Sequence, residues 1–159
     1  MNIKQLLEYI VRPTLIELGM HSLAAERLVM GTITQESNAM YIKQMGNGPA
    51  LGLAQMEPAT HDDIWKNFLK YKPSMAQSIT RLASLGSIQT TGIPDSKELI
   101  SNVSYAVAMC RAHYYRRPEP LPNADDIEAL GKYWKQHYNT HKGRGTASEF
   151  VERFPYEIL

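Results

Sequence analysis

Residues 22–37 read SLAAERLVMGTITQES, and residues 38–59, which follow directly, read NAMYIKQMGNGPALGLAQMEPA. The first stretch has the apolar spacing of a helix, and Ser22 in front of it is a residue type that favours helix N-caps. We therefore predict a helix from 23 to about 37. The second stretch loses this spacing, because glycine and proline crowd around a short apolar run. It predicts a structured loop with at most a small β-hairpin.

Helical periodicity recurs along the rest of the chain, and this predicts a mainly α single domain over residues 1–159. The longest apolar stripe, 99–114, is expected to form the central helix. Thr60 with Asp63, and Thr146 with Glu149, have the spacing of a capping box at a helix start. The other helices are predicted at about 3–18, with a kink at Pro13 and a stop at Gly19, and at 60–72, 74–85, 127–138 and 147–154.

The composition is that of an ordinary globular protein, with 43% hydrophobic and 21% charged residues. Seventeen Lys and Arg against sixteen Asp and Glu give a net charge of +1, which argues against nucleic acid as the main ligand. No apolar stretch is long enough to predict membrane insertion, and the N-terminus lacks the pattern of a signal peptide. The single cysteine, Cys110, lies in an apolar helical pattern and is expected to be buried and inert.

Glu36 stands on an apolar helical face, because Val29, Thr32 and Ile33 precede it by seven, four and three residues. Burial against apolar neighbours and the nearby helix C-terminus both favour the uncharged carboxyl, so we predict a raised pKa. A carboxyl with a raised pKa can serve as a general acid at neutral pH. The alternative is a structural role, in which Glu36 pairs with Arg or Lys or caps amides of the following loop.

Four ordered motifs carry a family resemblance. They are Glu36-Ser37, the stretch GLAQMEPAT at 52–60, Asn102-Val103, and Tyr138-Asn139 with GRG at 143–145. Together they resemble the motifs of soluble lytic transglycosylases of the lysozyme-like superfamily, and in particular its small phage-encoded members. In that family a Glu-Ser ends a helix, a Gly-Leu-Met-Gln with a Pro-x-Thr follows, Asn-Ile or Asn-Val opens the central helix, and Tyr-Asn-Ala-Gly comes near the end.

The resemblance implies a lysozyme-like domain that cleaves the glycan strands of peptidoglycan without a cofactor or metal. It places an N-terminal helix at 1–21 on the core, the motifs in 22–146 and a C-terminal helix at 147–159. Glu36 would be the catalytic residue, first acid and then base, and the substrate's own hydroxyl would close an anhydro ring. Ser37 would support Glu36, Gln55 would contact an N-acetylated sugar, and Tyr138 would lie beside Glu36. Met56 and Asn139 complete the predicted substrate-binding set.

Departures from the family pattern leave alternatives open. Ala54 stands where the family usually has Met, Thr140 and His141 replace an Ala-Gly, and Ala106 replaces a Gly of the central helix. One alternative is a non-catalytic phage structural or assembly protein of the same fold. Another is a muramidase that uses Glu36 with a second carboxylate such as Glu57, since most glycosidases use two. Asp62 and Asp63 are less suited, because we expect them in the first turn of a helix, where the dipole favours acids.

The expected partners are peptidoglycan glycan strands and other virion proteins. Two stretches, 64–94 and 131–145, each contain four Lys or Arg residues and no acid, which suits an anionic polymer. His137 and His141 stand four apart, but no third ligand is spaced nearby, so no metal site is predicted. Without a signal peptide, we expect a virion component that is made in the host cytoplasm and acts in the periplasm or cell wall.

Overall fold

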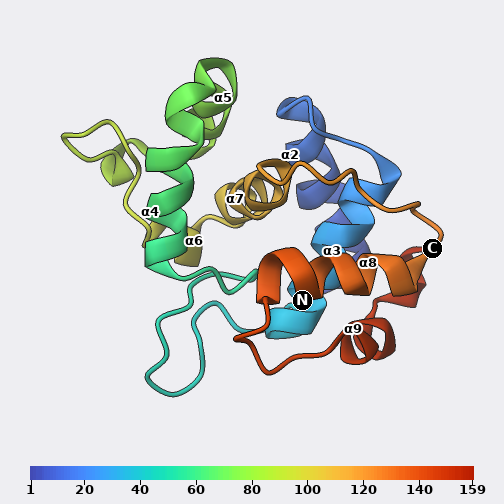
Figure 1. The fold of residues 1–159 in the computed structure, drawn as a ribbon. Coiled ribbons are helices and arrows are strands. Elements are labelled where there is room, and N and C mark those ends of the chain that lie inside the picture. Colours follow the sequence, from blue (N-terminus) through green and yellow to red (C-terminus); the bar gives the residue numbers. More distant parts are fainter.

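A computed structural model describes all residues from 1 to 159 and shows a mainly helical single domain without a β-sheet (Figure 1). None of the helices combines the length and apolar character that crossing a bilayer requires. The α-helices are α1 (Ile3–Leu6), α2 (Arg12–Glu17), α3 (Leu23–Ser37), α4 (Pro58–Asn67), α5 (Pro73–Leu82), α6 (Glu98–Ser101), α7 (Val103–Tyr115), α8 (Ile127–Trp134) and α9 (Ala147–Arg153).

The helix α7 is the central element, and the apolar core lies on both sides of it. Val107, Cys110 and Tyr114 belong to one buried cluster, which α7 shares with α3 and α8. Tyr105 and Met109 belong to a second cluster, which α7 shares with α4, α5 and α6. Figure 1 shows α7 between α4 and α5 on one side and α2 and α3 on the other. The predicted central helix is therefore confirmed, and α7 divides the core into two halves.

The helix α3 spans the predicted residues. Ser22 is its N-cap, and the Ser22 hydroxyl oxygen accepts a hydrogen bond from the Ala25 amide at 3.0 Å. The helix ends at Asn38, which takes a left-handed conformation with a φ of 55°. This C-cap turns the chain away from the helix axis directly after Glu36 and Ser37.

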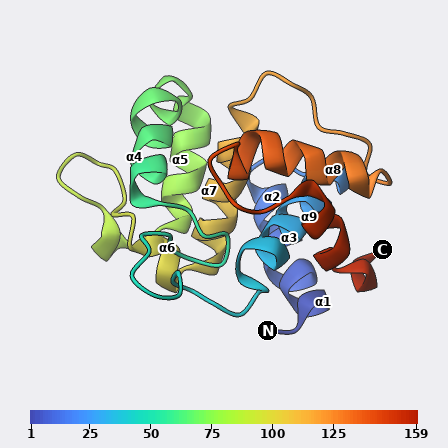
Figure 2. The same ribbon diagram turned by 60° about the horizontal axis from the view of Figure 1, so that its bottom comes forward.

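The loop after α3 contains no strand. Its only β-type pairing consists of the isolated bridges Lys43 to Leu51 and Leu51 to Met56, a reduced form of the predicted hairpin. The loop runs beside α6 before it enters α4 (Figure 2). Gly52 makes this approach possible: its φ is +76°, and a Cβ there would overlap the Leu99 carbonyl oxygen.

Several predicted helix boundaries differ from the structure, among them the end of the helix predicted at 60–72, since α4 ends at Asn67 and a short 3-10 helix, Leu69–Tyr71, follows. The helix expected to begin at the Thr60 capping box begins at Pro58, because proline without an amide hydrogen is well placed in a first turn. Asp62 and Asp63 therefore lie beyond the first turn, and no acid occupies it. The fifth predicted helix stretch, 99–114, is interrupted at Asn102, whose side chain caps α7 by accepting from the Tyr105 amide. The helix after Pro73 ends at Leu82, three residues before the predicted 85.

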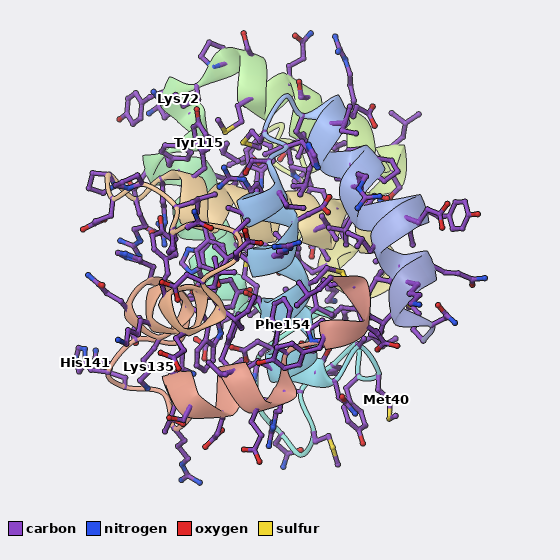
Figure 3. All side chains as sticks on the ribbon, turned by 90° about the vertical axis from the view of Figure 1, so that its right-hand side faces the viewer. Met40, Lys72, Tyr115, Lys135, His141 and Phe154 are labelled. Carbon is purple, nitrogen blue, oxygen red and sulfur yellow. The ribbon has the colours of Figure 1, made fainter.

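Two predicted helices contain a wider π-helical turn. In the first, the π-helix Leu7–Val11 joins α1 to α2, so Pro13 stands in the first turn of α2, and Gly19, with a φ of +68°, follows the end of that helix. In the other, α8 continues into the π-helix Lys135–Asn139. The predicted C-terminal helix is α9, and Figure 3 shows the Phe154 ring at its end lying among the helices. Met40 of the loop, by contrast, projects outward and is exposed.

Candidate active site

Glu36 is the next-to-last residue of α3, and its carboxyl is largely buried at one wall of an open cleft. Its one hydrogen-bond partner is the Trp134 indole, whose Nε1 donates to Glu36 Oε1 at 3.0 Å. Burial raises the pKa of Glu36 from 4.5 to about 7, although the Trp134 hydrogen bond favours the carboxylate. No Lys, Arg or His forms an ion pair with this carboxyl. The structural alternative of a salt-bridged Glu36 therefore does not apply.

The cleft has a volume of about 890 Å³ and lies between the loop after α3, the C-terminal end of α7 and the segment after α8. Five of its twenty-one lining residues are hydrophobic, and almost all of the others carry polar or charged side chains. A volume of this size is in the range of sites that enclose a small organic molecule or several sugar rings. All six site residues named from the sequence line it: Glu36, Ser37, Gln55, Met56, Tyr138 and Asn139.

The loop residues of the predicted site have mainly positioning contacts. The Ser37 hydroxyl lies 2.6 Å from the Leu53 carbonyl oxygen and 3.2 Å from that of Ile33, so Ser37 holds the loop against α3 and does not contact the Glu36 carboxyl. Gln55 has a φ of +50°, and its Nε2 donates to the Gly52 carbonyl at 2.9 Å. No protein group donates to the side-chain oxygen of Gln55, so that oxygen is free to accept. Met56 is buried and forms an isolated β-bridge with Leu51 of the same loop.

Tyr138 and Asn139, the last residues of the π-helix that follows α8, are held by contacts with the loop and within their own turn. Tyr138 donates its hydroxyl hydrogen to the Ala54 carbonyl at 2.7 Å, so it ties the π-helix to the loop. Asn139 accepts a hydrogen bond from Lys135 Nζ at 2.6 Å. Lys135 also donates to the Gly143 carbonyl, which closes the segment on itself. Figure 3 shows Lys135 and His141 on the same side of the molecule.

A second carboxyl and four cationic side chains also line the cleft. The second carboxyl is Glu57, the exposed N-cap residue of α4. The cations are Arg116, Arg117, Lys142 and Arg153. Of these four, Arg116 is held by Asp63 at 2.7 Å, and the other three form no ion pair. The cleft is thus positive at its rim, although the chain as a whole is nearly neutral.

Other residues considered from the sequence do not form a second site. Cys110 is fully buried, and burial raises the pKa of its thiol to about 12, as expected for an inert cysteine. His137 lies 3.8 Å from Glu119, and the chain has no group of three or more His, Cys, Asp or Glu side chains placed to bind a metal.

The roles of Trp134 and His113 at the cleft were not predicted from the sequence. Trp134 is the partner of Glu36, 98 residues away in the chain, and His113 lines the cleft beside Tyr138 with ring centroids 4.8 Å apart. Both lie on helical faces that carry ordinary core residues, so periodicity alone does not separate them from packing residues. Comparisons with protein-family models, with curated proteins and with solved structures gave no match to the chain.

Proposed function

We propose that the protein is a lytic transglycosylase that cleaves peptidoglycan glycan strands with Glu36 as its single acid and base. The observation that carries this proposal is a carboxyl with a pKa of about 7 at the wall of an open cleft, without a cationic partner. Such a group holds its proton near neutral pH and reaches a ligand in the cleft. The motif resemblance and the position of all six predicted site residues along this cleft support the same assignment.

In the proposed reaction, protonated Glu36 gives its proton to the glycosidic oxygen, and the bond from that oxygen to the anomeric carbon breaks. The resulting carboxylate takes a proton from the primary hydroxyl of the same muramoyl sugar. That hydroxyl oxygen then bonds to the anomeric carbon and forms a 1,6-anhydro ring. The proton count of Glu36 is restored and water is not consumed. The Trp134 indole stabilises Glu36 while it is ionised.

The other cleft residues have binding or positioning roles in this proposal. Gln55 offers its side-chain oxygen, to which no protein group donates, to an acetamido N–H, while its amide nitrogen donates to the Gly52 carbonyl and fixes the side chain. Tyr138 ties the loop to the π-helix, Ser37 ties it to α3, and Met56 lines the cleft between them. Asn139 lines the cleft, and the hydrogen bond from Lys135 to its side-chain oxygen holds it there. The cationic rim attracts a substrate whose peptide carboxylates are negatively charged.

The carrier that the motif resemblance favours is a bacteriophage particle. In this proposal the protein is made in the host cytoplasm, is packaged with other virion proteins and meets peptidoglycan when the particle enters a cell.

Digestion of isolated sacculi, with mass spectrometry of the soluble products, tests the activity. We expect the unmodified protein to release anhydromuropeptides and Glu36→Gln to release none, although its indole hydrogen bond to position 36 can remain. Asp125→Asn is the matched control, because Asp125 is exposed and pairs with Arg27 away from the cleft. A protein that is folded and releases nothing contradicts the proposal and favours the non-catalytic phage structural protein.

Glu57 supports a second candidate, a muramidase, because it places another carboxyl on the same cleft. A hydrolase would use water and release products with reducing ends. Glu57→Gln separates the two reactions. In a transglycosylase it leaves the anhydro products and most of the rate, whereas in a hydrolase with a second essential carboxylate it abolishes release.

A further inference from the structure

His113, near the C-terminal end of α7, belongs to a chain of polar contacts at the cleft wall. Its Nδ1 lies 3.0 Å from Arg116 Nη2, and Arg116 Nη1 donates to Asp63 Oδ2 at 2.7 Å. A guanidinium can only donate hydrogen bonds, so His113 Nδ1 must be the acceptor. The single proton of the neutral imidazole therefore lies on Nε2. Asp63 and Arg116 together fix which tautomer His113 adopts.

The imidazole of His113 remains neutral near physiological pH. Burial lowers its pKa to about 3, and the neighbouring cations Arg116 and Arg117 act in the same direction. His113 therefore acts as a hydrogen-bond donor through Nε2 and does not supply a charge.

No protein group accepts a hydrogen bond from His113 Nε2. The buried side-chain nitrogen and oxygen atoms without a partner belong to Arg27, Gln35, Arg116 and Arg117, so His113 Nε2 is not sealed in the interior. The residue is 6% exposed and lines the cleft, and its ring packs edge-on against Tyr138. The structure thus places an N–H donor in a fixed orientation at the cleft wall, and no protein group accepts a hydrogen bond from it.

We propose that His113 is a substrate-binding residue whose Nε2–H donates to the acetamido carbonyl oxygen of an N-acetylated sugar. This inference rests on the proposed function. An acetamido group has one acceptor, its carbonyl oxygen, and one donor, its N–H. The cleft offers the complementary groups: a donor that cannot accept at His113, and an acceptor at the Gln55 side-chain oxygen, to which no protein group donates.

Binding of tri-N-acetylchitotriose to a Glu36→Gln parent, measured by titration calorimetry, tests the inference without catalysis. His113→Phe keeps a flat ring against Tyr138 but lacks the donor, and we expect about tenfold weaker binding. His113→Gln can place an N–H near the same point, and we expect binding within about threefold of the parent's. An affinity of His113→Phe within threefold of the parent's, an equal loss in His113→Gln, or a parent that does not bind overturns the inference.

Should His113→Phe fail to fold, Arg116→Met tests the same hydrogen bond by removing the group that fixes the tautomer of His113. Without Arg116 the proton can move to Nδ1, and binding is expected to weaken about threefold. Unchanged binding of Arg116→Met then overturns the inference.

Digestion of sacculi by variants that retain Glu36 separates this inference from the proposed function. We expect His113→Phe to raise KM about tenfold and to change kcat less than twofold, since a purely structural defect lowers the amount of active protein and hence the apparent kcat. If the unmodified protein releases nothing, the proposed function fails, and the chitotriose titration still decides the role of His113.

Discussion

At the scale of a single residue, Glu36 is the point where sequence and structure agree most closely. Its place after Val29, Thr32 and Ile33 predicts a desolvated carboxyl, and burial is the largest cause of its raised pKa. The indole of Trp134 could not be predicted, because the two residues are brought together only when α8 packs against α3. That contact gives the buried carboxyl a hydrogen-bond donor once it ionises.

The raised pKa of Glu36 has a measurable effect on stability. The unfolded chain loses this proton near pH 4.5 and the folded chain near pH 7, so the free energy of unfolding falls as pH rises through that window. Glu36→Gln lacks this penalty. We expect it to be about 3 kcal/mol more stable than the unmodified protein at pH 8, and equal to it at pH 4. Urea denaturation at the two pH values measures this, and an equal difference at both would contradict it.

At the scale of secondary structure, two of the three helix starts predicted from capping residues are confirmed, and the third is overridden by a neighbouring proline. Ser22 and Thr146 act as the N-caps expected of them. Glu149, however, does not complete its capping box, because its carboxylate lies 3.4 Å from Gln35 Nε2 of α3. The Thr60 prediction was wrong because Pro58 starts the helix earlier. The site residues were found through motifs, but the contacts that fix their roles come from packing between helices.

Trp134→Phe tests the contact between α8 and α3. Phenylalanine can keep the packing against Phe150, whose ring centroid lies 5.7 Å from that of Trp134, but it removes the donor to Glu36. The pKa of Glu36 should then rise by about one unit, and so should the pH above which the rate of sacculus digestion falls. Tyr114→Phe is the control, since it removes a buried hydrogen bond to Thr32 that does not touch Glu36. An equal shift in both variants would contradict a specific role of the indole.

Gly52→Ala tests how the loop approaches α6. Position 52 needs a φ of +76°, and an added Cβ would overlap the Leu99 carbonyl oxygen. We expect a loss of about 2–4 kcal/mol in the free energy of unfolding. Gly46→Ala is matched in backbone strain, with a φ of +75°, but has nothing within 4 Å, so it should lose about 1 kcal/mol. Equal losses in thermal or urea denaturation would show that the close approach does not matter.

At the scale of the whole molecule, α7 separates two apolar clusters and ends at the cleft. One cluster holds α3 and α8, which carry Glu36 and Trp134, and the other holds α4 and α5. The hydrogen bond from Tyr138 to Ala54 ties the π-helix to the loop on the side of the first cluster, whereas Leu51 and Met56 of the same loop belong to the second. The mainly helical architecture could be predicted from periodicity, whereas the concentration of cations at the cleft depends on how the two sides meet.

The charge of the cleft rim should govern association with an anionic substrate. Arg117→Gln with Lys142→Gln removes two cations that form no ion pair. We expect the rate of sacculus digestion at low ionic strength to fall about fivefold, and the difference to disappear at high salt. Lys70→Gln is the control, because Lys70 is exposed beside Tyr71 and does not line the cleft. A salt-independent loss would mean that the two residues act by direct contact instead.

The most direct test of the account is the pKa of Glu36 itself. Carbon NMR of the glutamate side-chain carboxyls, titrated from pH 3 to 9 and assigned with Glu36→Gln, gives this value without any substrate. We predict one glutamate carboxyl with a midpoint of about 7, which is absent from Glu36→Gln. A midpoint near the ordinary 4.5 would contradict it, because Glu36 would then lack the proton that the proposed reaction requires.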